Sequence, residues 1–424
     1  MASQNKNGQA AVLGLQHLLA MYSGSILVPI MIGAALKYTP EQMTYLIATD
    51  IFMAGVATFL QVQMNKFFGI GLPVVLGVAF QSVAPLIIIG QKHGPSAIFG
   101  SIIVSGLFVI LISGFFSKVK NLFPPLVTGS VITTIGLTLI PVAMGNISDN
   151  KGVASAQDLL LAGITMLIIL ALNFFAKGFL RSIAVLIGLV AGTAIAATMG
   201  MVDSSVVAQA PWVHLPTPFY FGWPTFDIPS IIMMIIIAMV SMVESTGVYL
   251  ALSDITGKEL TADKLKKGYR AEGLAVMLGG VFNTFPYTGF SQNVGLVQLS
   301  GIKSRRPIFF AAGFLVLLGI LPKAGAMAQM IPAPVLGGGM MIMFGMVAVQ
   351  GIRMLSRVDF TNDHNLLIAG VAIAVGIGFN GAPDTFKNLP ANVQMFISNG
   401  IVMSSITAII LNLIFNGYKP KVKA

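Results

Sequence analysis

Three carboxylates of this chain stand inside long apolar stretches, where an ionised side chain is costly. Of the 14 Asp and Glu residues, these are Asp50, Glu244 and Glu272. A carboxylate at the centre of a bilayer costs about 2.5–3.5 kcal/mol on insertion scales, so we expect these groups to be kept for a function. Glu244, in MVSMVESTGVYLAL, could accept two N–H bonds from a planar heterocycle. The alternative is a structural partner for polar groups of a neighbouring helix.

The other two carboxylates are open to more than one interpretation. Glu272, in YRAEGLAVMLGG, could carry a coupling proton, because burial favours the protonated form of a carboxyl group. It equally fits an acid about one turn inside the cytoplasmic end of its segment, where the helix dipole would stabilise it. Asp50, in LIATDIFMAG, is also compatible with a polar residue used only in packing.

A second group of polar side chains follows a proline, in NTFPYTGFSQNVGLVQLSG. Ser291, Gln292 and Asn293 stand together after Pro286, and such a break followed by hydrogen-bonding side chains is typical of a substrate site on a broken membrane helix. The Gln292 amide offers an acceptor and donors in one plane, which matches the C=O/N–H edge of a purine or pyrimidine. Asn293 has the same chemistry at a different angle, and it could tie the broken backbone to a neighbouring span.

An earlier segment, GLPVVLGVAFQSVAP, is broken in the same way. It carries Pro73 and Gln81, as the later segment carries Pro286 and Gln292. Short, Pro/Gly-broken spans in corresponding positions are the strongest sequence pointer to a transport site, although two ordinary Pro-kinked helices would show the same pattern. Phe80, beside this break, could stack on a flat ring, or it could be one more core aromatic.

Gln16 and His17 form another polar pair, in the first apolar stretch. A single His in an apolar helix is more often a structural residue than a ligand-binding one. We therefore expect Gln16 and His17 to support the site without touching a substrate.

The composition fixes the class of protein. Hydrophobic residues make up 56% of the 424 residues and charged residues 9%, with a mean hydropathy of +0.88. A soluble domain carries about 25% charged residues, so this surface must face lipid. There is no Cys, the four His lack metal-ligand spacing and no Walker-type loop occurs, so we expect no metal, cofactor or ATP hydrolysis. The net charge of +10 does not indicate nucleic acid, because the basic residues lie in loops between apolar stretches.

Windows of about 20 apolar residues predict about 14 transmembrane segments. They span residues 11–36, 42–62, 69–90, 96–117, 124–145, 158–176, 182–201, 230–252, 269–285, 286–301, 308–330, 331–355, 364–379 and 396–416. If the N-terminus is cytoplasmic, 19 of the 24 Lys and Arg residues fall inside. This bias predicts that both termini are cytoplasmic and that the number of spans is even.

A weak internal repeat relates the two halves of the chain. FPPLVTGS at 123–130 resembles IPAPVLGG at 331–338, so that Pro124, Val127 and Gly129 recur 208 residues later. The two copies begin the fifth and the twelfth segments, which makes the repeat unit seven spans. Because seven is odd, the halves must enter the membrane with opposite polarity, and inverted repeats of this kind are typical of secondary transporters.

The string QNVGLVQLSG closely resembles the signature motif of the nucleobase–ascorbate transporter family. That motif begins with Gln, Glu or Pro, then has Asn, a Gly two residues later, a Thr or Ser five residues after the Gly, and a small or basic residue. Gln292, Asn293, Gly295, Ser300 and Gly301 fill it. A pattern with this many fixed polar and small positions is specific.

The resemblance extends over essentially the whole chain, because Gln16–His17, the VESTG run at Glu244 and the acid Glu272 come in the family's order and spacing. It implies an all-α polytopic membrane protein with 14 transmembrane segments in two inverted seven-span repeats. Short strands in the broken third and tenth spans would pair antiparallel at mid-membrane. Residues 1–123 and 230–330 would form a core domain (spans 1–4 and 8–11). Residues 124–229 and 331–424 would form a gate domain (spans 5–7 and 12–14), ending in a basic cytoplasmic tail.

The family's site residues map onto named positions of this chain. In the family the acid of the eighth span and the first motif residue hold the base, which here are Glu244 and Gln292. The aromatic of the third span and the residue just before the motif line the site, here Phe80 and Ser291, with Asn293 beside them.

The resemblance implies an importer of a purine nucleobase, xanthine or uric acid, by proton symport across the cell membrane. Glu272 and Glu244 are the candidate proton carriers, and a homodimer through the gate domains is expected. Gln292 resembles the purine branch of the family. The ninth-span acid is Glu272 where that branch commonly has Asp, and Ala79 stands where xanthine-type members often have a polar residue, so the choice between xanthine and uric acid stays open.

Other functions remain as alternatives. A permease for uracil or another nucleobase, and sodium coupling in place of proton coupling, fit the same pattern. An anion exchanger of the sulfate-permease type shares the architecture, but Glu244 would repel an anion. An integral-membrane enzyme would need a nucleophile–base pair or a metal cluster at one depth, and the sequence shows neither.

Overall fold

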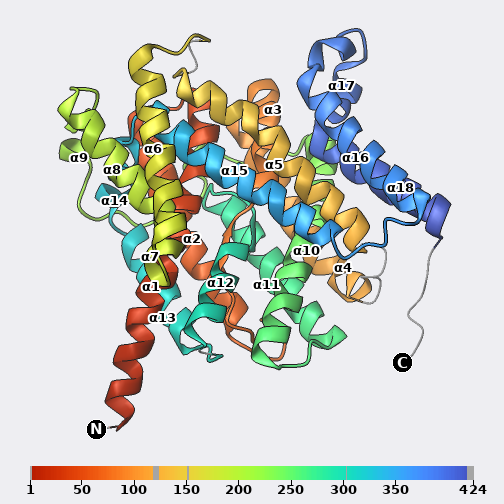
Figure 1. Ribbon diagram of the computed structural model, residues 1–424, viewed down its shortest axis with the longest axis horizontal. Helices are drawn as coiled ribbons and strands as arrows, with labels where there is room; N and C mark the ends of the chain where they lie inside the picture. Colours follow the sequence, from red (N-terminus) through yellow and green to blue (C-terminus); the bar gives the residue numbers. More distant parts are fainter. Residues whose placement is uncertain (1, 118–123, 150–151, 302, 418–424) are drawn as a thin grey trace.

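The computed structural model describes residues 2–117, 124–149, 152–301 and 303–417 (Figure 1). In chain order the elements are α1 (Ala2–Ala35), α2 (Pro40–Val62), β1 (Leu76–Val78), η1 (Phe80–Ser82), α3 (Val83–His93), α4 (Pro95–Phe116), α5 (Pro125–Ile147), α6 (Ala156–Phe175), α7 (Phe179–Ser182), α8 (Ala184–Thr198), α9 (Ser205–Gln209), α10 (Ile228–Thr256), α11 (Ala262–Val281), β2 (Tyr287–Gly289), α12 (Ser291–Ser300), α13 (Arg306–Gly319), α14 (Pro322–Gln329), α15 (Ala333–Leu355), α16 (Asp363–Gly381), η3 (Pro383–Phe386), α17 (Ala391–Ile397) and α18 (Gly400–Asn416). The basic tail expected at 418–424, and Lys118, Lys120 and Lys151 of the expected loops, lie outside the described residues.

The helices follow the apolar windows of the sequence, with some differences. Within the described residues, eight helices are long and apolar enough to cross a membrane, or nine if α13 and α14, bent by 80°, form one span. α8 and α18 are apolar but shorter than a full span. The window 269–285 is wrong at its start, because α11 begins at Ala262, where the Thr261 side chain caps it by accepting from the backbone N–H of Lys264. A total of 14 spans therefore stays a prediction.

The two windows with Pro/Gly breaks are not continuous helices. Window 69–90 contains β1, a 3₁₀ turn and the start of α3, and window 286–301 contains β2 followed by α12. The strands pair antiparallel, in the register Leu76↔Gly289 and Val78↔Tyr287. This confirms the expected strand in each broken segment and the pairing between them. Because every residue of both strands is buried, the ladder satisfies backbone groups that would otherwise be unpaired away from water.

Two groups of helices are distinguished by what they pack against. In one group α4 packs on α11, α2 packs on α13, and α1 lies against α13. In the other, α5 packs along α15, α6 contacts α15 and α8, and α16 lies against α18. In Figure 1 α5 and α15 cross the middle of the molecule, with α6 and α8 on the left and α16 and α18 on the right.

The contact between α5 and α15 is close and reciprocal. A Cβ built on Gly129 of α5 would lie 3.0 Å from the carbonyl oxygen of Gly351 on α15. A Cβ built on Gly337 of α15 would lie 2.8 Å from the carbonyl oxygen of Ala143 on α5. Positions 129 and 337 differ by 208 residues, and so do positions 143 and 351. The residues of the sequence repeat thus make equivalent contacts on the two helices.

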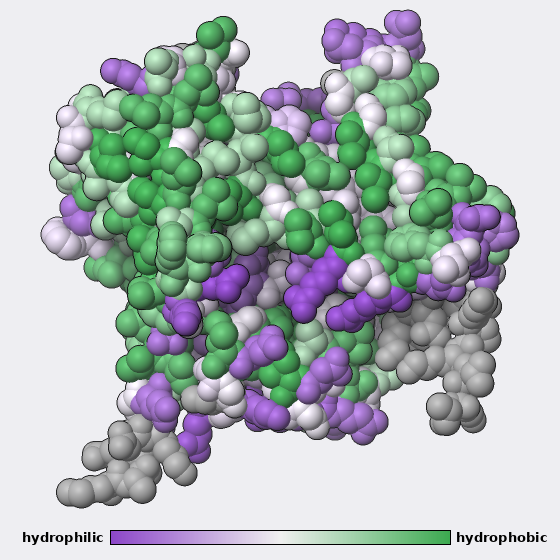
Figure 2. Space-filling model, in the orientation of Figure 1, coloured by the Kyte–Doolittle hydropathy of each residue, from purple (hydrophilic) through white to green (hydrophobic). Residues whose placement is uncertain are grey.

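One flank of the molecule exposes large apolar side chains. On α6 these are Leu159, Leu160, Leu167, Leu170, Phe174 and Phe175. Figure 2 shows a mostly hydrophobic surface over α6 and α8, at the upper left of the view. An apolar surface of this extent is what a bilayer would cover, as the low charge content indicates.

Candidate functional site

Glu244 lies in the middle of α10, where a polar side chain from the first broken segment meets it. The Nε2 atom of Gln81 donates a hydrogen bond to Oε2 of Glu244 over 2.8 Å, and it also lies 2.8 Å from Oγ of Ser241. Oε1 of Glu244 accepts no hydrogen bond from the described part of the chain. The Gln81–Ser241 pair therefore fixes one carboxylate oxygen and leaves the other available to a ligand donor.

A small cavity opens at Glu244. Val240 and Val243 of α10 line it together with Thr128 of α5 and Ser405 of α18. α5 and α18 belong to one helix group, whereas Gln81 and the strand pair hold α10 on the other side. Glu244 thus faces the place where the two groups meet.

Phe80 and Ser291 each begin the segment that follows a strand. Phe80 is buried and packs edge-on against Phe344 of α15, with ring centroids 5.7 Å apart. Ser291 is the first residue of α12, and its hydroxyl donates to Oε1 of Gln292 over 3.2 Å. Both Ser291 and Gln292 are half-buried. The first turn of α12 also offers backbone N–H groups and the positive end of its dipole at this point.

Asn293 points from α12 toward α1. Its Nδ2 donates to the backbone oxygen of His17 over 3.4 Å, and both residues are buried. This contact is the tie to a neighbouring span that the sequence suggests. His17 has no hydrogen bond at Nδ1, and Gln16 is half-buried beside it. These contacts agree with a supporting role for Gln16 and His17.

Asp50 holds the second strand to α2. It is fully buried, and Oδ1 accepts a hydrogen bond from the hydroxyl of Tyr287, the first residue of β2, over 2.9 Å. The same hydroxyl also lies 2.9 Å from Oγ1 of Thr284. Asp50 lines neither of the two cavities described in this section. The structure thus favours the packing interpretation of this carboxylate.

Glu272 lies deeper than the sequence suggests. Because α11 begins at Ala262, Glu272 is about three turns inside the helix, and the interpretation as a helix-start acid is wrong. Its side chain is 3% exposed. Oε1 accepts a hydrogen bond from the hydroxyl of Tyr249 on α10, and that hydroxyl in turn accepts from Nε2 of Gln61 on α2.

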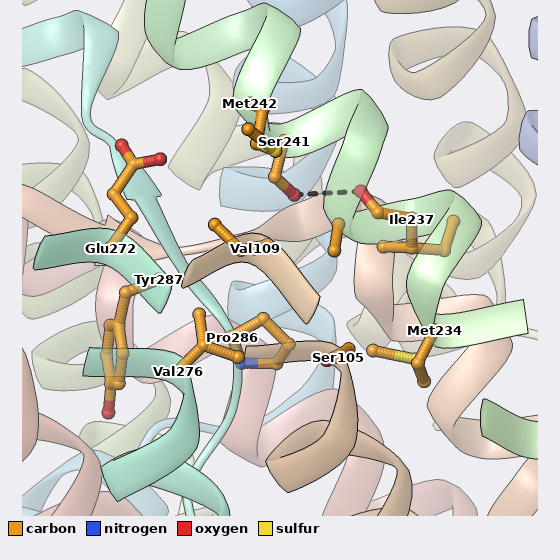
Figure 3. Close-up of a pocket in the computed structure, with 11 residues that line it drawn as sticks. Ser105, Val109, Met234, Ile237, Ser241, Met242, Glu272, Val276, Pro286 and Tyr287 are labelled. Atoms are coloured by element: carbon orange, nitrogen blue, oxygen red, sulfur yellow. Dashed lines mark hydrogen bonds between the residues drawn. The ribbon is translucent and has the colours of Figure 1, made fainter. Parts of the chain in front are cut away.

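A second small cavity is lined by both Glu272 and Ser241. Figure 3 shows Glu272 of α11 and Ser241 of α10 on its upper side, and Pro286 and Tyr287 on its lower side. Since Ser241 also accepts from Gln81, the surroundings of the two carboxylates share this residue.

Several residues of the site carry little signal in the sequence. In the sequence, Gln81 stands out only because it is the counterpart, in the first broken segment, of Gln292 in the second. Nothing in the sequence indicates which residue Gln81 contacts. Ser241 precedes Glu244 by one helical turn, but a hydroxyl in a membrane helix usually bonds its own backbone, as Ser241 also does. Tyr249 and Gln61 lie in apolar stretches, and only the packing of α2 against α11 and the contact between the two side chains reveal them. No cluster of three or more His, Asp or Glu residues that could hold a metal occurs in the described ranges.

The sequence and the fold both have known relatives. A model of the permease family matches residues 8–385. The chain is 53% identical to the xanthine permease of Bacillus subtilis over 97% of this chain and 95% of that protein. It is 52% identical to the uric acid permease PucK of the same organism, over 99% and 98%. It is 40% identical to the uric acid transporter UacT of Escherichia coli, over 97% and 87%.

The chain belongs to the nucleobase–ascorbate transporter family. The relatives named in this comparison are permeases and transporters, not enzymes, and with the apolar helices this indicates an integral membrane transporter. Among solved structures, the transmembrane domain of the cyanobacterial bicarbonate transporter BicA aligns with a TM-score of 0.65 at 14% identity, over 92% of this chain and 97% of that domain. SLC26A9 aligns with a TM-score of 0.58 at 15% identity, over 94% and 65%. At this level of identity the likeness concerns the fold alone.

Proposed function

We propose that this member of the family imports a purine nucleobase, xanthine or uric acid, by proton symport. The observation that carries the proposal is the free Oε1 of Glu244, held by Gln81 at the meeting point of the two helix groups. The names of the relatives at 53% and 52% identity support the purine class. The alternatives are uracil or another nucleobase, on the same site.

The proposed binding mode uses one acceptor, one amide and one ring. Glu244 accepts N–H bonds from the flat base, which carries several such donors along one edge. The Gln292 amide pairs with a C=O/N–H edge, and Phe80 offers its ring face. Ser291 orients the Gln292 amide through its hydroxyl, and Asn293 anchors α12 to α1. A base rather than an oxyanion such as sulfate is favoured, because Glu244 can accept from the N–H donors of a base, which sulfate lacks.

The proposed proton carrier is Glu272. Glu272 is buried and lies near Glu244, and it accepts a hydrogen bond from the hydroxyl of Tyr249. Neutralising such a group lowers the cost of moving it within the bilayer, so proton binding can be coupled to domain movement. Glu244 is the second candidate, and its neutralisation would disturb substrate binding as well.

Transport is proposed to proceed by alternating access between a core domain (1–123 and 230–330) and a gate domain (124–229 and 331–424). The two packing groups, the cavity between them and the equivalent contacts across 208 residues support this division and the inverted repeats. Cytoplasmic termini and a homodimer through the gate domains complete the proposal.

One uptake assay tests the proposed function. Cells that express the chain are given radiolabelled xanthine, with uric acid, uracil or ascorbate as competitors, and with or without a protonophore. We expect accumulation that uric acid inhibits strongly and that the protonophore abolishes. Inhibition by uracil but not by uric acid would indicate a pyrimidine substrate. Accumulation that depends on a sodium gradient and is unaffected by the protonophore would contradict proton symport.

A further inference from the structure

Glu272 ends a hydrogen-bond chain that crosses three helices. Nε2 of Gln61 on α2 donates to the hydroxyl of Tyr249 on α10, and this hydroxyl donates to Oε1 of Glu272 on α11. Gln61 and Tyr249 are both 0% exposed. Neither residue lines the cavity at Glu244 or the cavity at Glu272, so neither would touch a bound base.

The direction of this hydrogen-bond chain suits the ionised state of Glu272. Both donors point toward the carboxylate, which accepts at both oxygens while it is ionised and at one fewer position once it is protonated. A Glu272 protonated on Oε1 becomes a donor toward Tyr249, and the Tyr249 oxygen can accept from it only if the Tyr249 hydrogen finds another acceptor.

The side chain of Gln61 can supply that acceptor. Its Oε1 is buried and has no hydrogen-bond partner. A half-turn of the Gln61 amide exchanges Nε2 and Oε1, and the Tyr249 hydroxyl could then donate to Gln61 while it accepts from protonated Glu272. This exchange gives the Tyr249 hydroxyl an acceptor in either charge state, and a buried donor left unpaired is costly.

The remaining neighbours of Glu272 offer no positive charge. α11 itself adds Tyr269, α10 adds Glu244 and Ser245, α4 adds Ser105, and β2 adds Tyr287. Among these described groups there is no Lys, Arg or His. An ionised Glu272 therefore depends on neutral hydrogen-bond donors rather than on a counter-ion.

We propose that Tyr249 and Gln61 are positioning residues for coupling, which reverse the direction of this hydrogen-bond chain each time Glu272 gains or loses its proton. The inference rests on the proposed proton symport, and it assigns to that function two residues outside the substrate site. The reversal makes both charge states of Glu272 tolerable at the same buried position, as a repeated transport cycle requires.

The test separates substrate exchange from net accumulation. The full-length chain in membrane vesicles is assayed for exchange of labelled against unlabelled xanthine at equal pH, and for accumulation under an imposed pH gradient. Tyr249→Phe removes the hydroxyl and keeps the ring. We expect exchange within about twofold of the parent, and accumulation lower by about tenfold, the scale of a lost hydrogen bond to a charged group. The pH dependence of net uptake should also move to higher pH, because the ionised carboxylate has lost its donor.

Two further variants sharpen the result. Gln61→Met keeps the length of the side chain without its donor or acceptor, and it should lower accumulation in the same direction. The double variant should be no worse than Tyr249→Phe alone, because both residues act in one chain. The matched control is Tyr269→Phe, a buried tyrosine of the same cluster whose hydroxyl pairs with Thr246 over 2.5 Å. It should keep both exchange and accumulation.

Three results would overturn the inference. Parental accumulation by Tyr249→Phe means that the hydroxyl has no part in coupling. Loss of exchange together with accumulation, in both Tyr249→Phe and Gln61→Met, assigns these residues to folding or binding. Parental protein that accumulates xanthine without any proton dependence overturns the proton symport itself, and this inference with it.

Discussion

Nε2 of Gln81 donates to Oε2 of Glu244 over 2.8 Å and so joins two segments 163 residues apart in the chain. Gln81 follows the first strand of the pair, and Glu244 lies in the middle of α10. The strand pairing fixes where the chain leaves β1, and this position brings the Gln81 amide to the carboxylate. The broken segment and the intramembrane acid are therefore in direct contact. Any ligand that uses Glu244 meets a carboxylate with one oxygen already engaged.

The first prediction concerns Gln81. Gln81→Met removes the donor and keeps the bulk of the side chain, so Glu244 should lose its fixed orientation. We expect the apparent KM for xanthine to rise about tenfold, on the scale of a hydrogen bond to a charged group, with a smaller effect on the maximal rate. Initial rates of uptake over a range of xanthine concentrations measure this. The control is Gln91→Met, which makes the same change at an exposed position of α3 and should leave KM unchanged.

The second prediction concerns Glu244. Glu244→Gln replaces an acceptor with an amide whose N–H would face the ligand's own donors, and a buried unmatched donor costs roughly 1–3 kcal/mol. Uptake should be lost while the protein still reaches the membrane, as measured by transport and by immunodetection in the membrane fraction. Glu259→Gln, at an exposed loop position, should transport normally. Normal uptake by Glu244→Gln would remove this residue from the substrate site.

How far the sequence predicts the site depends on the kind of residue. Glu244 and Gln292 stand out because charged and amide groups are rare in apolar stretches, and the Pro/Gly breaks at Pro73 and Pro286 predict the two broken spans, whereas the paired strands follow only from the family resemblance. The sequence does not predict the partners of the carboxylates. Tyr249 is an ordinary residue of an apolar helix, and its place between two polar groups depends on packing that composition does not record.

The third prediction concerns recognition by Gln292. Gln292→Glu keeps the size of the side chain and loses both donors, so it should weaken purine transport and could move preference toward uracil. The measurement is inhibition of labelled xanthine uptake by a panel of nucleobases. Gln298→Glu makes the same change at an exposed position of the same helix, and it should keep the parental inhibition profile. If Gln292→Glu also keeps the parental inhibition profile, the Gln292 side chain does not take part in recognising the nucleobase.

The depth of Glu272 shows a different limit of sequence reasoning. Lys264, Lys266, Lys267 and Arg270 make residues 262–270 look like a loop by hydropathy, so the apolar window begins at 269. The Thr261 cap starts the helix earlier, and this places Glu272 in a buried layer instead of near an interface. A hydropathy window records the cost of exposing residues to lipid, whereas the helix boundary depends on local hydrogen bonds.

The fourth prediction separates binding from coupling. Glu272→Gln resembles a permanently protonated carboxyl group, so it should still bind xanthine and exchange it across the membrane. It should not accumulate xanthine against a gradient, because it releases no proton inside. Counterflow is measured beside net uptake at several external pH values, and parental uptake should fall as that pH rises. Accumulation against a gradient by Glu272→Gln would make Glu272 a structural residue and pass the coupling role to Glu244.

The last prediction concerns the contact between α5 and α15, which holds one helix group together. A Cβ on Gly136 of α5 would lie 2.3 Å from the backbone nitrogen of Ala348 on α15, and a backbone atom cannot move aside without separating the helices. Gly136→Ala should therefore cost about 1–3 kcal/mol of stability, as other overpacked sites do. The midpoint of thermal unfolding of the full-length protein in detergent measures it. Gly345→Ala on α15 is the matched control, because a Cβ there meets no atom within 4 Å. If both variants unfold at the parental temperature, the two helices are not held at this distance in the membrane protein, and the close packing proposed for the gate domain fails with them.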